Sequence, residues 1–518
     1  MTDSAEQQTL IDKLLQEQRQ LSAVDLFSAR HSKETKPALE NYYRDLIPLT
    51  APSPGEQYAF EVDLDNCSGC KACVTACHSL NGLDADETWR DIGQLLSGPT
   101  ARPVTQTVTT ACHHCVEPGC MHGCPVKAYV KDDVTGIVRH LDDQCIGCQY
   151  CSLMCPYDVP KYSARRGIVR KCDMCHGRLA DGEAPACVQG CPNGAITIRI
   201  VRKEEVRSRA FRGLFLAGAP APSATAPSTI YSSQRNFVAG PLWGEQEEVR
   251  PAADHWPLVI TLVLMQAAAG ASLLSLVAKA LGWIPPNDKA TTFLAAGCCA
   301  AGLAASMFHL GRPQGAWRWF LGLRTSWLSR EIAAFSLFAG ALALQTGALF
   351  LPLPTAATAL ISLACAVAAV LATTTSIMVY AATQREFWST KRVVSKFFGT
   401  SAVLGSAAMW LLTSGTAFIG TILVAAFAKM ASESLERLAG TPALNRSRSL
   451  LTGALAPQRR ARMFCLVLGG LALPLVVLAT GYSVVLAGVA VGLLLVGEFM
   501  ERRLFFRAIG KGGMPGVK

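Results

Sequence analysis

The chain has 518 residues, which is too long for one domain, and half of its residues are hydrophobic. Its formal net charge is +10, from 48 Lys and Arg against 38 Asp and Glu. The excess lies in short connections between long apolar runs, so it indicates membrane topology and argues against a phosphate-binding face. We expect no nucleic-acid partner.

Residues 1–57 predict a helical extension and a linker. Residues 5–28 intersperse apolar positions with Gln, Lys, Glu and Arg, which is typical of an amphipathic helix, with a break near Ser22 as an option. We expect its apolar side to pack on its own domain; the alternative is a docking arm for a partner subunit. Residues 46–57 are rich in proline and form the linker. We recognise no secretory or twin-arginine leader at the start.

Sixteen of the twenty cysteines lie in four groups of four. The groups are Cys67, Cys70, Cys73 and Cys77; Cys112, Cys115, Cys120 and Cys124; Cys145, Cys148, Cys151 and Cys155; and Cys172, Cys175, Cys187 and Cys191. The first and third groups have the spacing C-x2-C-x2-C-x3-C, which is the bacterial ferredoxin signature for [4Fe–4S] clusters. The sequence therefore predicts iron–sulfur clusters, with these sixteen cysteines as iron ligands.

Two other uses of cysteine fit less well. A disulfide framework is typical of short secreted chains, and zinc ribbons need two cysteine pairs a dozen or more residues apart, which only the fourth group offers.

Short strands are predicted at 58–64, 136–140 and 195–201, next to the cysteine groups.

The run Cys145-Ile-Gly-Cys-Gln-Tyr-Cys-Ser-Leu-Met-Cys-Pro-Tyr, followed by Val159-Pro-Lys-Tyr, resembles the four-cluster electron-transfer subunit of dimethyl-sulfoxide-reductase-type molybdoenzymes. The resemblance covers about residues 58–201 and implies a ferredoxin-like α+β domain, here 58–202, with four [4Fe–4S] clusters. It also implies that the two halves exchange fourth ligands. The implied ligand sets are Cys67, Cys70, Cys73 with Cys191; Cys172, Cys175, Cys187 with Cys77; Cys112, Cys115, Cys120 with Cys155; and Cys145, Cys148, Cys151 with Cys124.

Residues 203–254 include an Ala-, Pro- and Ser-rich stretch, which predicts a tether, either solvated or strapped over the domain surface. Residues 255–508 then predict an all-α membrane domain of about eight transmembrane helices, and 509–518 a tail. The expected spans are 257–281, 290–310, 329–352, 356–383, 398–414, 416–434, 462–480 and 482–506. Ser414-Gly-Thr is either a turn between the fifth and sixth spans or a kink in one helix.

Arginine and lysine gather in alternate connections, at 311–330, 385–396, 437–462 and 502–511. With eight spans, this distribution predicts a multi-pass protein of the bacterial inner (cytoplasmic) membrane, with the cysteine-rich domain and both termini in the cytoplasm.

The second half also resembles a known subunit. The motifs His255-Trp-Pro-Leu-Val, Phe308-His-Leu-Gly-Arg-Pro, Ser326-Trp-Leu-Ser-Arg-Glu and Gly497-Glu-Phe are similar to the haem-free membrane anchor of the same reductases. This resemblance implies that His309 and Glu331 bind quinol, menaquinol in that family, and accept its protons. The alternative is that His309 caps a helix while Glu331 pairs with Arg330 or Arg312. Because this half contains only two histidines, His255 and His309, we expect no haem.

Together the two resemblances predict a fused electron-transfer and anchor subunit. It would take electrons from the membrane quinone pool and pass them through four clusters to a separate molybdopterin-containing catalytic subunit. No segment is spare for a molybdopterin domain, so we expect no terminal reduction by this chain alone. The alternatives are the same module reducing quinone for a dehydrogenase, and a redox-linked ion-translocating module. The latter is disfavoured because ionisable residues within the predicted spans are nearly absent.

Overall fold

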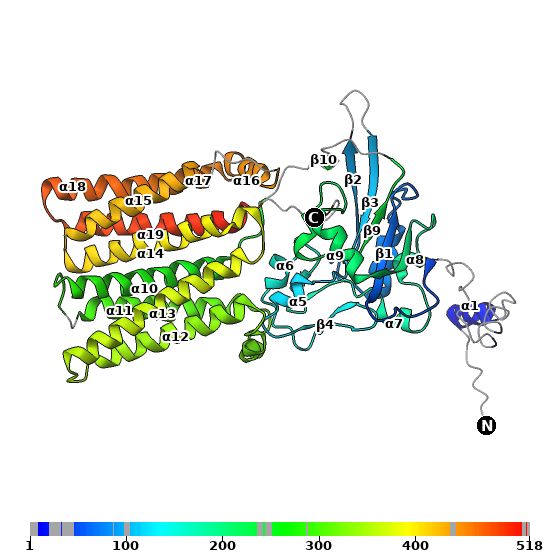
Figure 1. The fold of residues 1–518 in the computed structure, drawn as a ribbon, viewed down its shortest axis with the longest axis horizontal. Helices are drawn as coiled ribbons and strands as arrows, with labels where there is room; N and C mark the ends of the chain where they lie inside the picture. Colours follow the sequence, from blue (N-terminus) through cyan, green and yellow to red (C-terminus); the bar gives the residue numbers. More distant parts are fainter. Residues whose placement is uncertain are drawn as a thin grey trace.

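In the computed structural model the chain forms a cysteine-rich domain and a bundle of long helices that lie end to end (Figure 1). The structure describes residues 9–19, 29, 33, 46–85, 87–97, 104–235, 242–243, 251–285, 288–435, 442–509 and 514. We use "cysteine-rich domain" for residues 46–235 and "bundle" for residues 256–507.

A three-stranded sheet joins the two ends of the cysteine-rich domain. Its central strand β1 (Glu56–Asp63) pairs antiparallel with β8 (Ile196–Arg202) and parallel with β9 (Ile230–Ser232). Phe60 and Val62, in the alternating pattern that predicted β1, are buried in the core. Because β1 precedes the first cysteine group and β8 follows the last, this pairing brings the ends of the cysteine-bearing segment together.

Between β1 and β8 the cysteines lie on loops and short helices. The other strands are β2 (Asp91–Ser97), β3 (Val104–Thr110), β4 (Tyr129–Lys131), β5 (Val138–His140), β6 (Lys161–Ser163), β7 (Ile168–Arg170) and β10 (Leu242–Trp243). The helices are α4 (Ala72–Asn81), α5 (Gly119–Gly123), α6 (Tyr150–Met154), α7 (His176–Ala180) and α8 (Ala186–Gln189). β2 pairs with β3 and β10, β4 with β5, and β6 with β7. The expected α+β domain is confirmed, and the strands predicted at 136–140 and 195–201 are β5 and β8.

The stretch predicted as a tether is folded onto this domain as far as Ser232. It contains α9 (Lys203–Phe211), the short helix η2 (Pro222–Ala224) and β9. Ser228 is buried, and its hydroxyl donates to the carbonyl of His113 at 2.7 Å. The sequence left open whether this stretch is a solvated tether or a strap over the domain surface, and this part of it forms a strap. Met514, near the end of the chain, also packs into the domain core.

Seven helices of the described chain are long and apolar enough to cross a membrane. They are α10 (Trp256–Ala280), α11 (Lys289–Met307), α12 (Trp327–Ala348), α13 (Thr355–Ala381), α15 (Ala417–Leu435), the continuous helix Ala456–Thr480 formed by α17, η5 and α18, and α19 (Val484–Arg507). α14 (Thr390–Thr413) is an eighth long helix whose first turns carry Lys391, Arg392 and Lys396. The expectation of about eight spans is thus consistent with the bundle.

The fifth and sixth predicted spans are separate helices. Ser414 has a left-handed backbone, with φ of 55°, and its N–H donates to the carbonyl of Trp410. This geometry ends α14 in a turn, and α15 returns beside it (Figure 1). The sequence could not decide between a turn and a kink because Ser414-Gly-Thr is compatible with both.

Charged side chains inside the bundle contradict the expectation that such residues are nearly absent from the spans. Lys429 of α15 forms an ion pair of 2.5 Å with Glu498 of α19, and both are buried. Lys396 pairs with Glu501 at 3.1 Å, and Arg502 is fully buried beside them. These residues lie toward the ends of apolar runs, where the sequence shows them singly. The fold brings them together, and pairing lowers the cost of burying each charge.

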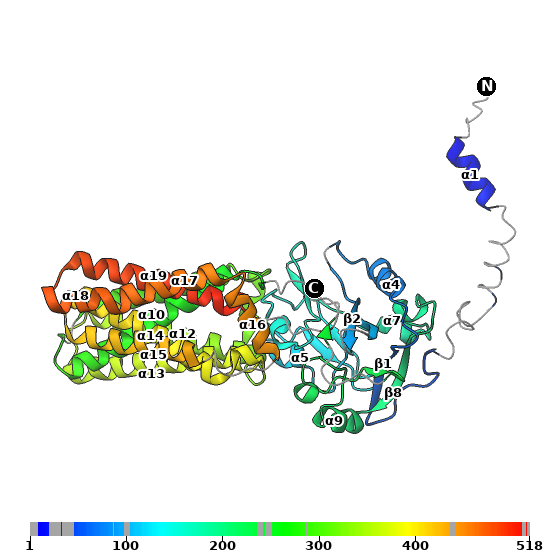
Figure 2. The same ribbon diagram turned by 90° about the horizontal axis from the view of Figure 1, so that it is seen from above.

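The amphipathic segment at the start forms α1 (Leu10–Arg19), shorter than the predicted helix, and residues 20–28 lie outside the described residues. Figure 2 shows α1 apart from the cysteine-rich domain and the bundle. Leu10, Ile11 and Leu14 are 74%, 68% and 53% exposed. The expectation that this apolar side packs on its own domain is therefore wrong for these residues, because no element of the described chain lies against them.

The buried pair gives a stability prediction. Glu498→Gln leaves the Lys429 ammonium buried without its carboxylate, and we expect a loss of about 3 kcal/mol or more, seen as a lower thermal midpoint of the detergent-purified chain. Glu498→Gln combined with Lys429→Met should be less destabilised than the sum of the two single variants. Strict additivity would show that the two charges do not interact.

Candidate functional site

The sixteen cysteines gather into four sets, and each set takes its fourth member from another group. Besides burial, the influences that raise the pKa of Cys67 are the thiol charges of Cys73, Cys191 and Cys70. The other neighbourhoods follow the same rule: Cys77 lies among Cys187 and Cys175; Cys115 among Cys112, Cys155 and Cys120; and Cys151 among Cys148, Cys124 and Cys145. All sixteen are free cysteines. The structure thus brings together the cysteines that the sequence grouped by resemblance.

The four sets follow one another through the domain. The charges of Cys120 and Cys151, which belong to two different sets, both raise the pKa of Tyr129. In the same way Cys112 raises the pKa of Cys172, and Cys73 raises that of Cys187. Figure 1 shows α5 and α6 beside the bundle and α7 and α8 on the far side. The set of Cys145, Cys148, Cys151 and Cys124 therefore lies nearest the membrane helices, and the sets with Cys187 and Cys191 lie farther out.

Two buried cations lie between the sets. Lys171 is 2% exposed, and its ammonium group donates to the thiol of Cys112 at 3.5 Å. Arg90 is also 2% exposed, lies among the thiols of Cys187, Cys73, Cys172 and Cys77, and keeps its buried Nη2 without a hydrogen-bond partner. An uncompensated buried cation costs several kcal/mol. Cysteine-ligated iron–sulfur clusters are anionic, so these cations and thiols fit them.

Burial raises the pKa of several of these cysteines. It raises the pKa of Cys77 to about 12 and that of Cys124 to about 11, in both cases with a contribution from neighbouring thiols. At neutral pH such thiols are protonated unless a metal displaces the proton, because the thiolate is the form that binds metal. Binding of iron to Cys77 and Cys124 would therefore release their protons.

The bundle meets the cysteine-rich domain at the set nearest to it. A Cβ atom at Gly311 would overlap the carbonyl oxygen of Gly167, and one at Gly147 would overlap the same atom. The N–H of Arg312 donates to the carbonyl of Ile146 at 3.0 Å. On the other side of the junction, Arg385 forms an ion pair of 2.8 Å with Asp158. The two parts are thus in direct backbone contact around the third cysteine group.

A cavity of about 540 Å³ lies at this junction. Its walls are largely apolar and come from α10, α11, α12, α13 and the helical turns η3 (Pro313–Gly322). Cys148 and Tyr150 contribute from the cysteine-rich domain, and His309 and Glu331 from the bundle. One cavity therefore contains both predicted proton acceptors and a cysteine of the nearest set, in the form usual for a small-molecule site.

His309 follows α11 and faces the cysteine-rich domain. Its Nε2 lies 3.2 Å from the carbonyl oxygen of Cys148, and its ring packs edge-on against His255 with ring centroids 5.5 Å apart. Burial and the neighbouring His255 lower the pKa of His309 to about 4, so the imidazole is neutral at pH 7. Because a carbonyl oxygen only accepts, the Nε2–H of the neutral ring donates to Cys148, and Nδ1 is the ring nitrogen that can accept a proton.

Glu331 is in the first turns of α12 and is 8% exposed. The alternative, an ion pair between Glu331 and Arg330 or Arg312, does not agree with the hydrogen bonds that these arginines make. Arg330 donates to the carbonyls of Leu323 and Arg324, and Arg312 to those of Arg166 and Asp142. The carboxyl of Glu331 instead faces the cavity. The phenols of Tyr150 and Tyr380 lie close enough to interact electrostatically with this carboxyl.

Sequence reasoning missed the two tyrosines of the cavity. The hydroxyl of Tyr150 donates to the carbonyl of Val379 at 2.8 Å, and so it connects the third cysteine group to α13. Burial raises the pKa of Tyr150, with a smaller contribution from Glu331, so the phenol stays protonated. Tyr150 stands inside the quoted cysteine motif, and its position between two cysteines was a usable signal. Tyr380 lies at the end of an apolar run, and nothing in the sequence indicates that it faces Glu331.

Comparison with known proteins agrees with this division of the chain. Residues 104–200 match the family model described as "4Fe-4S dicluster domain", and residues 251–507 match "DMSO reductase anchor subunit (DmsC)". A probable anaerobic dimethyl sulfoxide reductase subunit, YnfG of Escherichia coli K12, is 34% identical over 190 residues, which are 35% of this chain and 90% of the relative. The chain belongs to the iron–sulfur subunits of the anaerobic dimethyl sulfoxide reductase family.

Other relatives extend the comparison. The B subunit of the anaerobic dimethyl sulfoxide reductase of Haemophilus influenzae is 32% identical over 184 residues, covering 34% of this protein and 88% of the relative. The hydrogenase-2 operon protein HybA of Escherichia coli O157:H7 is 35% identical over 193 residues, covering 32% of this protein and 57% of the relative. As a dimethyl sulfoxide reductase iron–sulfur subunit fused to a DmsC-type anchor, the protein is a multi-pass membrane protein for electron transfer. Both resemblances drawn from its motifs are confirmed.

The backbone contact at the junction can be tested by one methyl group. Gly311→Ala should force the bundle away from Gly167, because the opposing atoms are backbone and cannot turn aside. We expect a loss of about 1 to 3 kcal/mol, measured as a lower thermal midpoint of the purified chain. Gly340→Ala, in α12 with open space around the new methyl group, is the control and should leave the midpoint unchanged or slightly raised. Equal midpoints for the two variants would contradict the close contact.

Proposed function

We propose that the chain oxidises a quinol, menaquinol by family resemblance, in the junction cavity and passes the electrons through four [4Fe–4S] clusters to a separate molybdopterin-containing catalytic subunit. The observation that carries this proposal is the single cavity lined by His309, Glu331 and Cys148. Quinol oxidation releases two protons and two electrons, so it needs proton acceptors beside an electron acceptor.

In this proposal the clusters supply one-electron carriers along the domain. The ligands would be four sets of cysteines: Cys145, Cys148, Cys151 and Cys124; Cys112, Cys115, Cys120 and Cys155; Cys172, Cys175, Cys187 and Cys77; and Cys67, Cys70, Cys73 and Cys191. The proximity of the cysteines within each set supports this assignment. Lys171 and Arg90 would lie between successive sets and offset their negative charge. Electrons would enter at the set beside the bundle and leave at the far side, where a partner subunit has access.

The bundle residues would bind and orient the quinol. Apolar side chains such as Leu262 and Phe335 line the cavity and suit the ring and the isoprenoid tail of a quinol. His309 would accept one hydroxyl proton at its neutral imidazole, and Glu331 would accept the other at its carboxylate. Because the His309 ring contacts the Cys148 carbonyl, the hydroxyl it binds would lie close to the entry point for electrons.

The opposite direction, quinone reduction for a dehydrogenase, is the second candidate. The similarity to a hydrogenase-2 operon protein favours it, since a module of this kind serves more than one type of complex. A redox-linked ion-translocating module gains support from the paired charges around Lys429 and Glu498, but these form closed ion pairs and do not line the junction cavity.

We further propose that the cysteine-rich domain lies on the cytoplasmic side of the bacterial inner membrane. The basic connections predicted from the sequence are those at the end of the bundle next to this domain, as the contacts of Arg312 and Arg385 indicate. Positive connections remain in the cytoplasm, which supports this orientation.

The quinol site predicts a selective defect in two variants. His309→Gln and Glu331→Gln remove a proton acceptor, and each should slow bleaching of the cluster absorption by a reduced menaquinone analogue roughly hundredfold in anaerobic stopped-flow mixing. Glu386→Gln changes an exposed carboxylate in the connection between α13 and α14 and should keep the wild-type rate. Reduction by dithionite checks that all variants retain their clusters. Wild-type quinol rates in both site variants would refute the assignment.

A further inference from the structure

The junction cavity reaches the surface of the bundle at one particular side. Among the described residues that line it, the exposed ones are Ala304 and Met307 of α11, Trp317 of η3 and Ser336 of α12. Met307 is 45% exposed and Trp317 is 62% exposed. The wall from α10 and α13 is buried instead, as Leu262 and Tyr380 show at 3% each, and the cysteine-rich domain closes the end. The cavity therefore opens sideways, between α11 and α12 and next to η3.

The η3 turns border this opening with aromatic side chains. Trp317 and Phe320 are 62% and 47% exposed, and their ring centroids are 6.1 Å apart. Next to them, Arg318 donates from Nη1 to the carbonyl of Asp143 at 3.0 Å, which fixes η3 to the cysteine-rich domain. Exposed aromatic rings at the ends of membrane spans are typical of the boundary between water and hydrocarbon. The opening is thus at the level where the bilayer begins.

The proposed substrate is longer than the cavity. A volume of about 540 Å³ suits one compact ligand, such as the fused-ring head group of a quinol. A quinol of the bilayer also carries an isoprenoid chain that is longer than its ring system. Burial of that chain requires either a longer channel or an opening to lipid. The opening between α11 and α12 meets this requirement, because the end of the chain can stay among lipid acyl chains.

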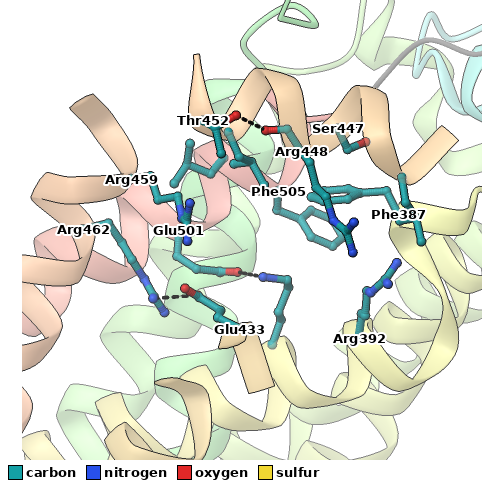
Figure 3. A pocket seen from close by; sticks show the side chains of 14 residues that line it. Phe387, Arg392, Glu433, Ser447, Arg448, Thr452, Arg459, Arg462, Glu501 and Phe505 are labelled. Atoms are coloured by element: carbon teal, nitrogen blue, oxygen red, sulfur yellow. Dashed lines mark hydrogen bonds and ion pairs between the residues drawn. The ribbon is translucent and has the colours of Figure 1, made fainter. Parts of the chain in front are cut away.

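Another cavity of the bundle has the opposite chemistry. It has a volume of about 270 Å³ and lies among α14, α15, α17, α19 and α16 (Pro442–Thr452) (Figure 3). Ion pairs line it, with Glu433 and Arg462 at 2.6 Å and Glu501 and Lys396 at 3.1 Å. An isoprenoid chain placed there would separate these charged groups from water without replacing its hydrogen bonds. The junction cavity, with its largely apolar walls, is the better match for such a chain.

We propose that the quinol enters the junction cavity from the bilayer between α11 and α12, and that its isoprenoid chain lies in this opening against Ala304 and the ring of Trp317. This inference rests on the proposed quinol oxidation and adds the route and the grip on the chain. Trp317 is a positioning residue here. By holding the chain it directs the head group toward His309 and Glu331, deeper in the same cavity.

A photoreactive quinone locates the chain without any electron transfer. The full chain with its clusters is placed in liposomes with a menaquinone analogue that carries a diazirine in its second isoprene unit, and adducts are mapped by mass spectrometry. We expect adducts on α11, η3 or α12 around the opening, and excess unlabelled menaquinone should suppress them. Ala304→Trp fills the opening and should lower the yield roughly tenfold. Ala301→Trp, at an exposed alanine of α11 that does not line the cavity, should keep it.

A second pair of variants covers the case in which Ala304→Trp fails to fold, which its iron content reports. Trp317→Ala should lower the adduct yield, whereas Phe320→Ala, at an exposed ring of η3 that does not line the cavity, should keep it. Adducts confined to other helices, or equal yields within the folded pair of variants, would overturn the proposal. Adducts that persist in excess unlabelled menaquinone would also overturn it, because ordinary lipid chains would then occupy the opening.

Failure of the proposed function gives a different result. Cluster absorption is recorded in the same liposomes after addition of a menaquinol that bears the chain. Labelling at the opening that menaquinone suppresses, in a chain whose clusters menaquinol does not reduce, would contradict quinol oxidation and still support this entrance. Reduction of the clusters together with adducts on other helices would contradict the entrance alone.

Discussion

The function of this chain depends on how closely the bundle meets the third cysteine group. Gly311 and Gly167 touch without side chains between them, and Arg312 is bonded to the backbone beside Cys145. This contact places the junction cavity directly against Cys148. A fused polypeptide fixes this geometry within one chain, so the cavity and the nearest thiol set are held together by covalent continuity as well as by packing.

Charge balance is the second organising constraint, and it takes a different form in each part. In the cysteine-rich domain the buried cations Arg90 and Lys171 lie among thiols, so anionic groups held by the cysteine sets would balance their charge. In the bundle, Lys429 and Glu498 neutralise each other. The first arrangement indicates a bound cofactor, whereas the second stabilises helix packing in a medium of low dielectric constant.

Much of this could be predicted from sequence because cysteine spacing and apolar length are local properties. The four groups, β1, and the positions of most spans follow from patterns within about 25 residues of chain. The neighbours of Glu331 could not be predicted from the sequence. Domain docking brings Tyr150 to it from 181 residues away along the chain, and packing of α13 on α12 brings Tyr380 from 49 residues away. The pairing of Lys429 with Glu498 was missed for the same reason. The exposed side of α1 was mispredicted because an amphipathic pattern does not identify the surface that will cover it.

The central claim is that electrons from the cavity enter only through the set that contains Cys148. Cys124→Ala removes the fourth member of this set without changing the cavity lining. EPR spectra of the anaerobic variant, recorded after addition of a reduced menaquinone analogue and again after dithionite, test the claim directly. The account predicts that quinol leaves the remaining clusters oxidised while dithionite reduces them. Reduction of those clusters by quinol at the wild-type rate would contradict it.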